Sequence, residues 1–188
     1  MNVTVAAVTQ QTGFAEFDEL FREHYRLIYR TALAITGRSA DAEDVLQTIF
    51  LRLLRREFPP DLKKNPRAYL YRAAVNASLT ALRARRRRLQ LHDIDAVQVL
   101  YASHDSNDDT HARLIDALGH LSASAVELLM LRYFHAYSDA EIAKMLGTTR
   151  GSVAVRLFRA RAQLKKLIKR QERTYERESE DDQTHPAD

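Results

Sequence analysis

The chain has 188 residues, of which 29 are lysine or arginine and 25 are aspartate or glutamate, giving a formal net charge of +4 at pH 7, and it contains no cysteine. The lack of cysteine excludes disulfides, thiol redox switches and cysteine-ligated zinc. No apolar run reaches the roughly 20 residues of a membrane span, and no basic-then-apolar leader opens the sequence, so we expect a cytoplasmic protein without membrane insertion.

Long helices are expected throughout, because the chain has only five glycines and four prolines. Residues 1–13 are polar and aperiodic, and we expect them to be disordered. From Phe14 to Gly37, apolar residues recur at three- and four-residue spacings, which predicts a core-forming helix that the glycine ends. Ser39 is the expected cap of the next helix, whose predicted buried stripe ends at Leu54.

A second side of that helix carries Asp44, Gln47, Leu51 and Arg55, and Leu51 has no obvious internal partner. This side is either a docking surface for a partner protein or simple charge compensation of the helix dipole beside one exposed leucine. The residues alone favour the second interpretation.

A Phe-Pro-Pro stretch ends this helix, and a loop is expected over residues 61–65. A helix follows over residues 66–88 with Asn65 as its cap. Across this loop and helix nine basic residues face a single acid. Rings, positive charge and a side-chain amide together suit unpaired nucleic-acid bases. The residues leave an alternative open, in which Tyr69 and Tyr71 are core tyrosines and the arginine run is a solvated helix end.

Residues 89–109 are acidic, and we expect them to form a flexible linker. A set of histidines and aspartates there invites a metal site, but no regular element fixes these side chains relative to one another, so a solvated linker is favoured. The set consists of His104, Asp105, Asp108, Asp109 and His111.

The C-terminal half predicts two helices joined by a tight turn. Ser138 and Glu141 form a capping box, Gly147 ends the first helix, and Thr149 caps a longer second one. Between Glu141 and Arg170 nine basic residues face one acid, an imbalance that suits phosphate binding. The pattern predicts a DNA-binding helix-turn-helix. An ordinary helical hairpin with a solvated basic face is the alternative.

The second helix of this pair has two distinct faces. Its apolar stripe consists of Val153, Leu157, Ala160 and Leu164. The opposite face carries Gly151, Ser152, Val155 and Arg159. Before the pair, a helix near residues 110–118 and a serine-capped helix are expected, the latter packing through Val126, Leu129, Met130 and Tyr133. Residues 171–188 hold seven acids and two arginines, which predicts a disordered tail that either solubilises the chain or shields the basic helix.

Residues 14–169 together resemble the sigma-70 family of bacterial RNA polymerase sigma factors, in the extracytoplasmic-function type with regions 2 and 4 only. FDELFREHYRLIYRTALAITG and DAEDVLQTIFLRLLRR resemble the start of region 2, and NPRAYLYRAAVNASLTALRARRRR resembles its promoter-melting helix. LSASAVELLMLRYFHAYSDAEIAKMLGTTRGSVAVRLFRARAQL resembles region 4. The resemblance implies an all-α fold, with region 2 over residues 14–88 and region 4 over residues 110–170, joined by the flexible acidic linker.

The same resemblance implies a function. The protein would be no enzyme and would need no cofactor or metal. It would bind core RNA polymerase at the β′ clamp helices and the β flap, direct it to promoter DNA, and be held inactive by an anti-sigma factor. The docking interpretation of the second helix is then preferred, and it maps to Asp41, Glu43, Asp44, Gln47 and Leu51.

Two DNA sites are implied as well. Region 2 would capture flipped bases of the minus-10 strand through Lys63, Lys64, Asn65, Tyr69, Arg72, Asn76 and Arg83. Region 4 would read the minus-35 duplex through Arg150, Gly151, Ser152, Ala154, Val155, Arg156 and Arg159.

The chain departs from its relatives at a few of these positions. Tyr69 stands where tryptophan is frequent, and Ala154 and Val155 stand where lysine and serine are common. We therefore expect Val155 to contact thymine methyl groups, with Ser152 and Arg150 supplying most of the polar readout. Two rival functions are a dimeric regulator with the N-terminal half as its sensor and, more weakly, a metal-dependent enzyme using the cluster between His104 and His111.

Overall fold

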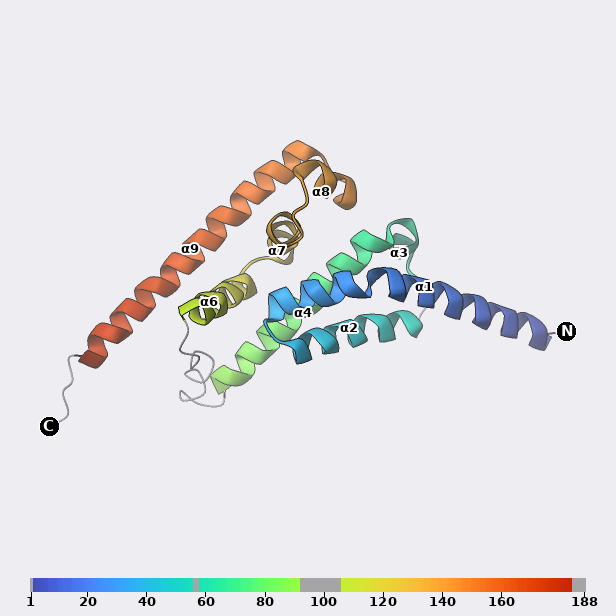
Figure 1. Cartoon of the computed structure of the whole chain (residues 1–188), viewed down its shortest axis with the longest axis horizontal. Coiled ribbons are helices and arrows are strands. Elements are labelled where there is room, and N and C mark those ends of the chain that lie inside the picture. Colours follow the sequence, from blue (N-terminus) through green and yellow to red (C-terminus); the bar gives the residue numbers. More distant parts are fainter. Residues whose placement is uncertain (1, 56–57, 92–105, 184–188) are drawn as a thin grey trace. The chain divides into compact units, whose positions relative to one another are not determined.

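The computed structural model describes residues 2–55, 58–91 and 106–183, and every regular element within these ranges is a helix (Figure 1). The chain divides into two compact units, residues 1–81 and residues 82–188. The prediction of an all-α protein is therefore confirmed for the described part of the chain. None of the described helices is long and apolar enough to cross a membrane.

The first unit contains four helical elements: α1 (Asn2–Thr36), α2 (Ser39–Leu54), α3 (Pro60–Lys64) and the first part of α4 (Pro66–Leu91). Helices α1 and α2 pack against each other (Figure 1). Gly37 has a φ of 71°, a backbone conformation that glycine adopts without steric cost, and it lies where the chain leaves α1 for α2. The core that results is lined by Ile28, Ala32, Ile49, Phe50, Leu53, Leu62, Leu70 and Ala74.

Aromatic rings extend this core along α1. Phe17 and Phe21 both meet Phe50 of α2 edge to face, with ring centroids 5.7 Å and 4.7 Å apart. Such edge-on contacts are favourable beyond the apolar area they bury. They fix α2 against α1.

Several local predictions for this unit were wrong. The structure includes residues 2–13 in α1, where we expected no regular structure; the stretch before Gly13 contains neither glycine nor proline, the two residues that interrupt helices most strongly. Ser39 is the first residue of α2, and the cap position before it holds Arg38, which makes no side-chain cap. The expected loop contains helix α3, whose start is favoured by a proline at its first position.

The second unit contains the last part of α4 with α6 (Ser106–His120), α7 (Ala123–Leu129), a π-helical turn η1 (Met130–Phe134), α8 (Asp139–Leu146) and α9 (Arg150–Gln183). Ser122 caps α7, since its Oγ accepts the backbone N–H of Ala125 at 3.2 Å. Helices α6, α7 and α8 all pack on α9. Figure 1 shows α9 as one long helix in this unit. The core of this second unit is lined by Val126, Leu128, Leu131, Ile142, Val153 and Leu157.

Predictions at the ends of this unit also need correction. Helix α9 continues to Gln183, so most of the predicted tail is helical, and residues 184–188 lie outside the described part. Both ends of the predicted linker are helical: residues 89–91 belong to α4 and residues 106–109 belong to α6. Its centre, residues 92–105, lies outside the described residues. Tyr133, expected to pack on the helix pair, is 58% exposed, because the wider turn of η1 shifts the register of the side chains that follow Met130. Its hydroxyl still accepts a hydrogen bond from Arg161 Nη1 of α9 at 3.3 Å.

Candidate nucleic-acid and polymerase interfaces

Helices α8 and α9 form the predicted helix-turn-helix, and its caps are confirmed. Ser138 Oγ accepts the backbone N–H of Glu141 at 3.3 Å, and Glu141 Oε2 accepts the backbone N–H of Ser138 at 2.8 Å. Gly147 ends α8 in the left-handed conformation with a φ of 65°. Thr149 Oγ1 then accepts the backbone N–H of Ser152 at 3.2 Å, which starts α9. These contacts fix the turn between α8 and α9.

The first turns of α9 have one buried and one exposed face, as predicted. Val153, Leu157 and Ala160 are buried in the domain core. On the other side Val155 is 51% exposed, and a Cβ placed on Gly151 would meet no atom within 4 Å. An open face of this kind is what entry into a major groove requires.

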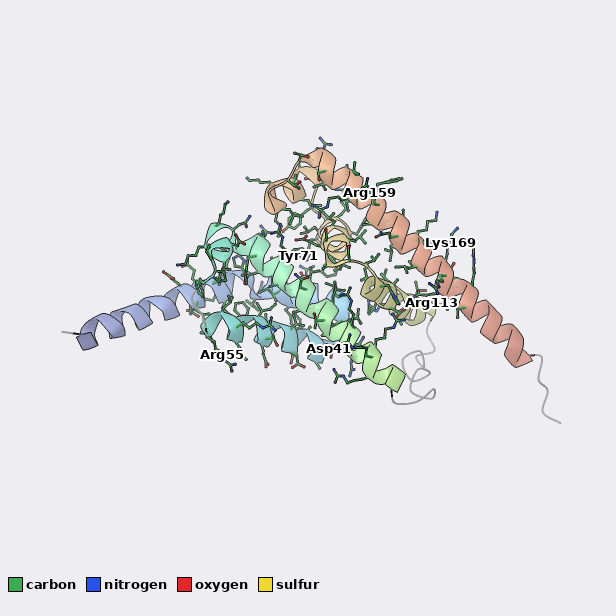
Figure 2. The ribbon with its side chains drawn as sticks, turned by 180° about the vertical axis from the view of Figure 1, so that it is seen from behind. Asp41, Arg55, Tyr71, Arg113, Arg159 and Lys169 are labelled. Atoms are coloured by element: carbon green, nitrogen blue, oxygen red, sulfur yellow. The ribbon has the colours of Figure 1, made fainter. Side chains whose placement is uncertain are left out.

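Two residues of this face differ from expectation. Arg156 is half-buried, and its guanidinium donates a hydrogen bond to Ser124 Oγ in the first turn of α7. Phe158 is 67% exposed and was absent from the predicted site, although it lies on the flank of the predicted recognition face. By contrast, Arg150, Ala154 and Arg159 are exposed as expected, and Ser152 is half-buried. Figure 2 shows Arg159 on α9.

The two tyrosines of α4, for which the sequence left a core role and a binding role open, differ in burial. Tyr71 is fully buried, so the core interpretation is correct for this residue (Figure 2). Tyr69 is half-buried and packs against the core while keeping part of its surface exposed. Arg72 and Asn76 are exposed, and the spacing of three and seven residues places them on the same face as Tyr69. One ring, one cation and one amide therefore share a surface.

The segment before α4 adds two cations and a cap. Lys63 and Lys64 are exposed at the end of α3. Asn65 is half-buried, and its Oδ1 accepts the backbone N–H of Ala68 at 3.1 Å. The predicted cap is confirmed, and it means that Asn65 also shapes the start of the helix on which Tyr69 lies.

Arg83 does not join this surface in the same way, because residue 82 onward belongs to the second unit. Its Nε donates to the carbonyl of Gly119 at 3.0 Å and its Nη2 to the carbonyl of Leu121 at 2.8 Å. An arginine at these positions satisfies carbonyls that the end of α6 leaves without helical partners. Its guanidinium is therefore occupied within the protein.

A charged cluster surrounds this contact. Arg86 Nη1 lies 3.3 Å from Asp116 Oδ1 and also contacts His120 Nε2. Burial and then the charge of Arg86 lower the pKa of His120, while Asp116 raises it. Among the residues that the structure describes, no group of three or more possible ligands is arranged to hold a metal ion. The cluster between His104 and His111 lies partly outside the described residues.

Helix α2 presents the predicted docking side. Glu43, Asp44 and Gln47 are exposed, Asp41 is half-buried, and Leu51 is 48% exposed. Asp41 and Arg55 lie toward opposite ends of this helix (Figure 2).

Leu54 also belongs to this side, against the prediction that it is buried. It is 46% exposed, because the last residue of the helix lies three positions beyond Leu51 on the same face. The exposed side of α2 therefore has an acidic beginning and an apolar end.

Comparison with known proteins matches both units to described families. Residues 20–88 match the family model Sigma-70 region 2, and residues 111–164 match Sigma-70, region 4. The chain is 32% identical over 154 residues to the ECF RNA polymerase sigma factor SigM of Mycobacterium tuberculosis, covering 81% of this chain and 76% of SigM. The chain belongs to the sigma-70 family of RNA polymerase sigma factors.

A second relative of this sigma factor is the RNA polymerase sigma-E factor of Streptomyces avermitilis, 31% identical over 156 residues that cover 81% of this chain and 85% of the relative. Among solved structures, CnrH in complex with the cytosolic domain of CnrY is 25% identical, with a TM-score of 0.47 over 81% of this chain and 87% of CnrH. The protein is thus an ECF-type sigma factor, which binds core RNA polymerase and directs promoter-specific initiation of transcription. The region 2 match contradicts the rival view of the N-terminal half as a regulator's sensor.

The two family matches contain the surfaces described above. The region 2 match includes the exposed side of α2 and the surface around Tyr69. The region 4 match includes α8 and the first turns of α9, and it ends before Lys165.

Proposed function

We propose that this sigma factor contacts polymerase and promoter through three separate surfaces of the described residues. The exposed side of α2, with Asp41, Glu43, Asp44, Gln47 and Leu51, docks on the β′ clamp helices. Its acidic start attracts basic partners, and Leu51 and Leu54 supply apolar area that is exposed in the free protein. Both properties support a protein interface.

The second surface binds the minus-10 single strand. Tyr69 offers a ring on which an extruded base stacks, and Asn76 offers an amide for a base edge. Lys63, Lys64 and Arg72 bind the phosphates. Asn65 holds the start of α4 in place through its cap. Arg83 takes part only after it gives up its two bonds to the carbonyls of Gly119 and Leu121.

The third surface reads the minus-35 duplex. Gly151 allows close approach of the backbone, Val155 contacts thymine methyl groups, and Arg150, Ser152 and Arg159 supply donors. Ala154 lines the same face, and Arg156 binds phosphate or continues to hold Ser124. The observation that carries this proposal is the open face of α9 beyond a fully capped helix-turn-helix.

Promoter selection is tested by transcription in vitro from a genomic fragment library, using core polymerase with and without this protein. We expect new start sites that share a minus-10 and a minus-35 sequence only when the protein is present. Start sites that do not depend on the protein, or that share no upstream sequence, would contradict the proposal.

We further propose that the protein acts in the cytoplasm without catalysing a reaction, and that an anti-sigma factor restrains it. Such a partner has exposed apolar residues to cover on each unit: Leu51 and Leu54 on the first, and Tyr133, Phe134 and Phe158 on the second. The test is to purify the sigma factor from cells grown without an inducing signal, and we expect an anti-sigma factor to co-purify with it. A free sigma factor under those conditions would count against restraint by a protein partner.

A further inference from the structure

Helix α9 does not end where the region 4 match ends. The match stops at residue 164, and the helix continues without interruption to Gln183. The continuing segment contains five exposed cations, and four of them, Lys165, Lys166, Lys169 and Arg173, form the group that we name the basic stripe. The fifth, Arg170, acts electrostatically on His120 of α6. Because the basic stripe lies on the same straight element as the recognition turns, its position relative to them is fixed by helix geometry.

The roll of α9 about its axis is also fixed. Leu164, Leu167 and Ile168 are half-buried on the side where α6 packs. Gln171 Nε2 donates a hydrogen bond to Asp116 Oδ2 of α6 at 2.6 Å. These contacts hold one side of the segment against the domain, so the opposite side faces outward.

The basic stripe occupies that outward side. At about 100° per residue, its four members project into the same sector as Gly151, Val155 and Arg159, opposite Val153. The distance along the axis from Val155 to Arg173 is about 27 Å at 1.5 Å per residue. The stripe therefore extends the proposed DNA-reading face well past its base-contacting turns (Figure 2 labels Lys169).

The basic stripe has one acidic neighbour within its own length, the exposed Glu172, which follows Lys169 by three residues. Among the side chains that the structure describes, none of its four members forms an ion pair. Lys165, Lys169 and Arg173 follow one another at four-residue intervals, a spacing at which like charges destabilise a helix. A polyanion with closely spaced charges relieves this repulsion, and duplex DNA is such a polyanion.

We propose that the basic stripe binds the phosphate backbone of promoter DNA that flanks the minus-35 element, without reading its sequence. The proposal rests on the proposed function, because it requires the first turns of α9 to occupy the groove. Continuity with that face favours DNA over an acidic protein as the occupant. The stripe would add affinity and salt dependence but no base preference.

The test replaces the four members together by glutamine in the full-length protein, K165Q, K166Q, K169Q and R173Q. The matched control removes the same charge from the first unit, with R22Q, R26Q, R30Q and R38Q. Each protein is assembled with core polymerase, and its Kd for a promoter fragment from the transcription experiment is measured over a KCl series. Circular dichroism checks that helix content is unchanged.

We expect the stripe variant, and not the control, to lose about tenfold or more in affinity and to reduce the slope of log K against log salt by about 2 to 4. The loss should be the same when the flanking bases are changed. Equal Kd and slope for the two variants would overturn the proposal. It would also be overturned if the stripe variant bound DNA as wild type does but no longer bound an acidic protein partner. Failure of the proposed function is distinguishable, since wild-type holoenzyme would then show no promoter preference.

Discussion

Val153 and Val155 lie two positions apart on α9, and the side chain of the first is fully buried whereas that of the second is 51% exposed. Two residues along a helix change the direction of a side chain by about 200°. One valine therefore packs in the core and the other lies on the proposed DNA face. Substituting each valine in turn tests stability and DNA recognition separately.

Replacing Val155 by serine should leave stability within about 0.5 kcal/mol of wild type and change promoter preference at a minus-35 thymine. Replacing Val153 by alanine should cost about 1 to 3 kcal/mol through loss of buried surface, without a change in preference. Urea unfolding and transcription from a set of minus-35 variants measure the two effects. Unchanged preference at every minus-35 position in the serine variant would contradict the methyl contact.

Gly147 and Gly151 offer a second matched pair. Gly147 has a φ of 65°, so alanine there should cost about 1 kcal/mol even though no atom lies within 4 Å of the added Cβ. Gly151 is the second residue of α9, where alanine should stabilise the helix by up to about 0.5 kcal/mol yet weaken minus-35 binding by blocking close approach. Thermal unfolding and duplex binding test both. A Gly151→Ala variant that binds as well as wild type would show that the backbone does not approach DNA there.

Tyr71 and Asn76 separate folding from single-strand binding on α4. Tyr71→Ala should destabilise the protein by about 3 to 5 kcal/mol, because a fully buried ring is lost. Asn76→Ala should change stability little, since the side chain is exposed, and should weaken minus-10 strand binding by about 1 to 3 kcal/mol. Binding of the holoenzyme to a fragment with an unpaired minus-10 strand measures the second effect. Full binding by the Asn76 variant would remove this residue from the site.

Leu51 and Leu54 should matter for polymerase binding and not for folding. Both are nearly half exposed, so serine at both positions should leave the unfolding midpoint almost unchanged while weakening the affinity for core polymerase by about tenfold or more. Leu114→Ser, at a leucine of similar exposure in the second unit, is the control. Equal affinity of the double variant and the control would place the interface elsewhere.

Stability should fall in mild acid because of His24. This side chain is 5% exposed, and burial lowers its pKa below the ordinary 6.5, with Glu23 opposing the effect and Arg67 adding to it. The unfolded state therefore binds the proton more readily than the folded state. The stabilising contribution is present above pH 6.5 and is lost as the pH falls through the lowered value.

Urea midpoints at about pH 7.5 and about pH 5.5 test this pH dependence. His24→Gln should reduce the difference between the two midpoints. His120 also has a lowered pKa, but its side chain is 41% exposed, so His120→Gln should reduce the difference less. Identical pH dependence in wild type and the His24 variant would exclude this histidine as the cause.

Local sequence signals predicted many of the features that position the candidate site. The capping box at Ser138, the left-handed Gly147 and the caps at Thr149 and Asn65 all depend on residues within four positions of one another. The exposed face of the first turns of α9 followed from helical periodicity alone. These signals are local, and local chemistry decides them before any tertiary contact forms.

Other features depended on packing between distant segments. Tyr69 and Tyr71 have the same chemistry, and only the core beneath α4 decides that one is partly exposed and the other fully buried. Arg83 is an ordinary basic residue in the sequence, and only its two bonds to carbonyls at the end of α6 show that its guanidinium is occupied.

The sequence by itself determined the helical class, the family and the caps, because these follow from periodicity, motif order and neighbouring side chains. The tertiary structure decided which side of each helix faces outward: it exposed Leu54, turned Arg156 toward Ser124, and held the opposite side of α9 against α6 so that the basic stripe faces outward. Burial is a property of contacts between segments far apart in the chain, and no single helix carries that information.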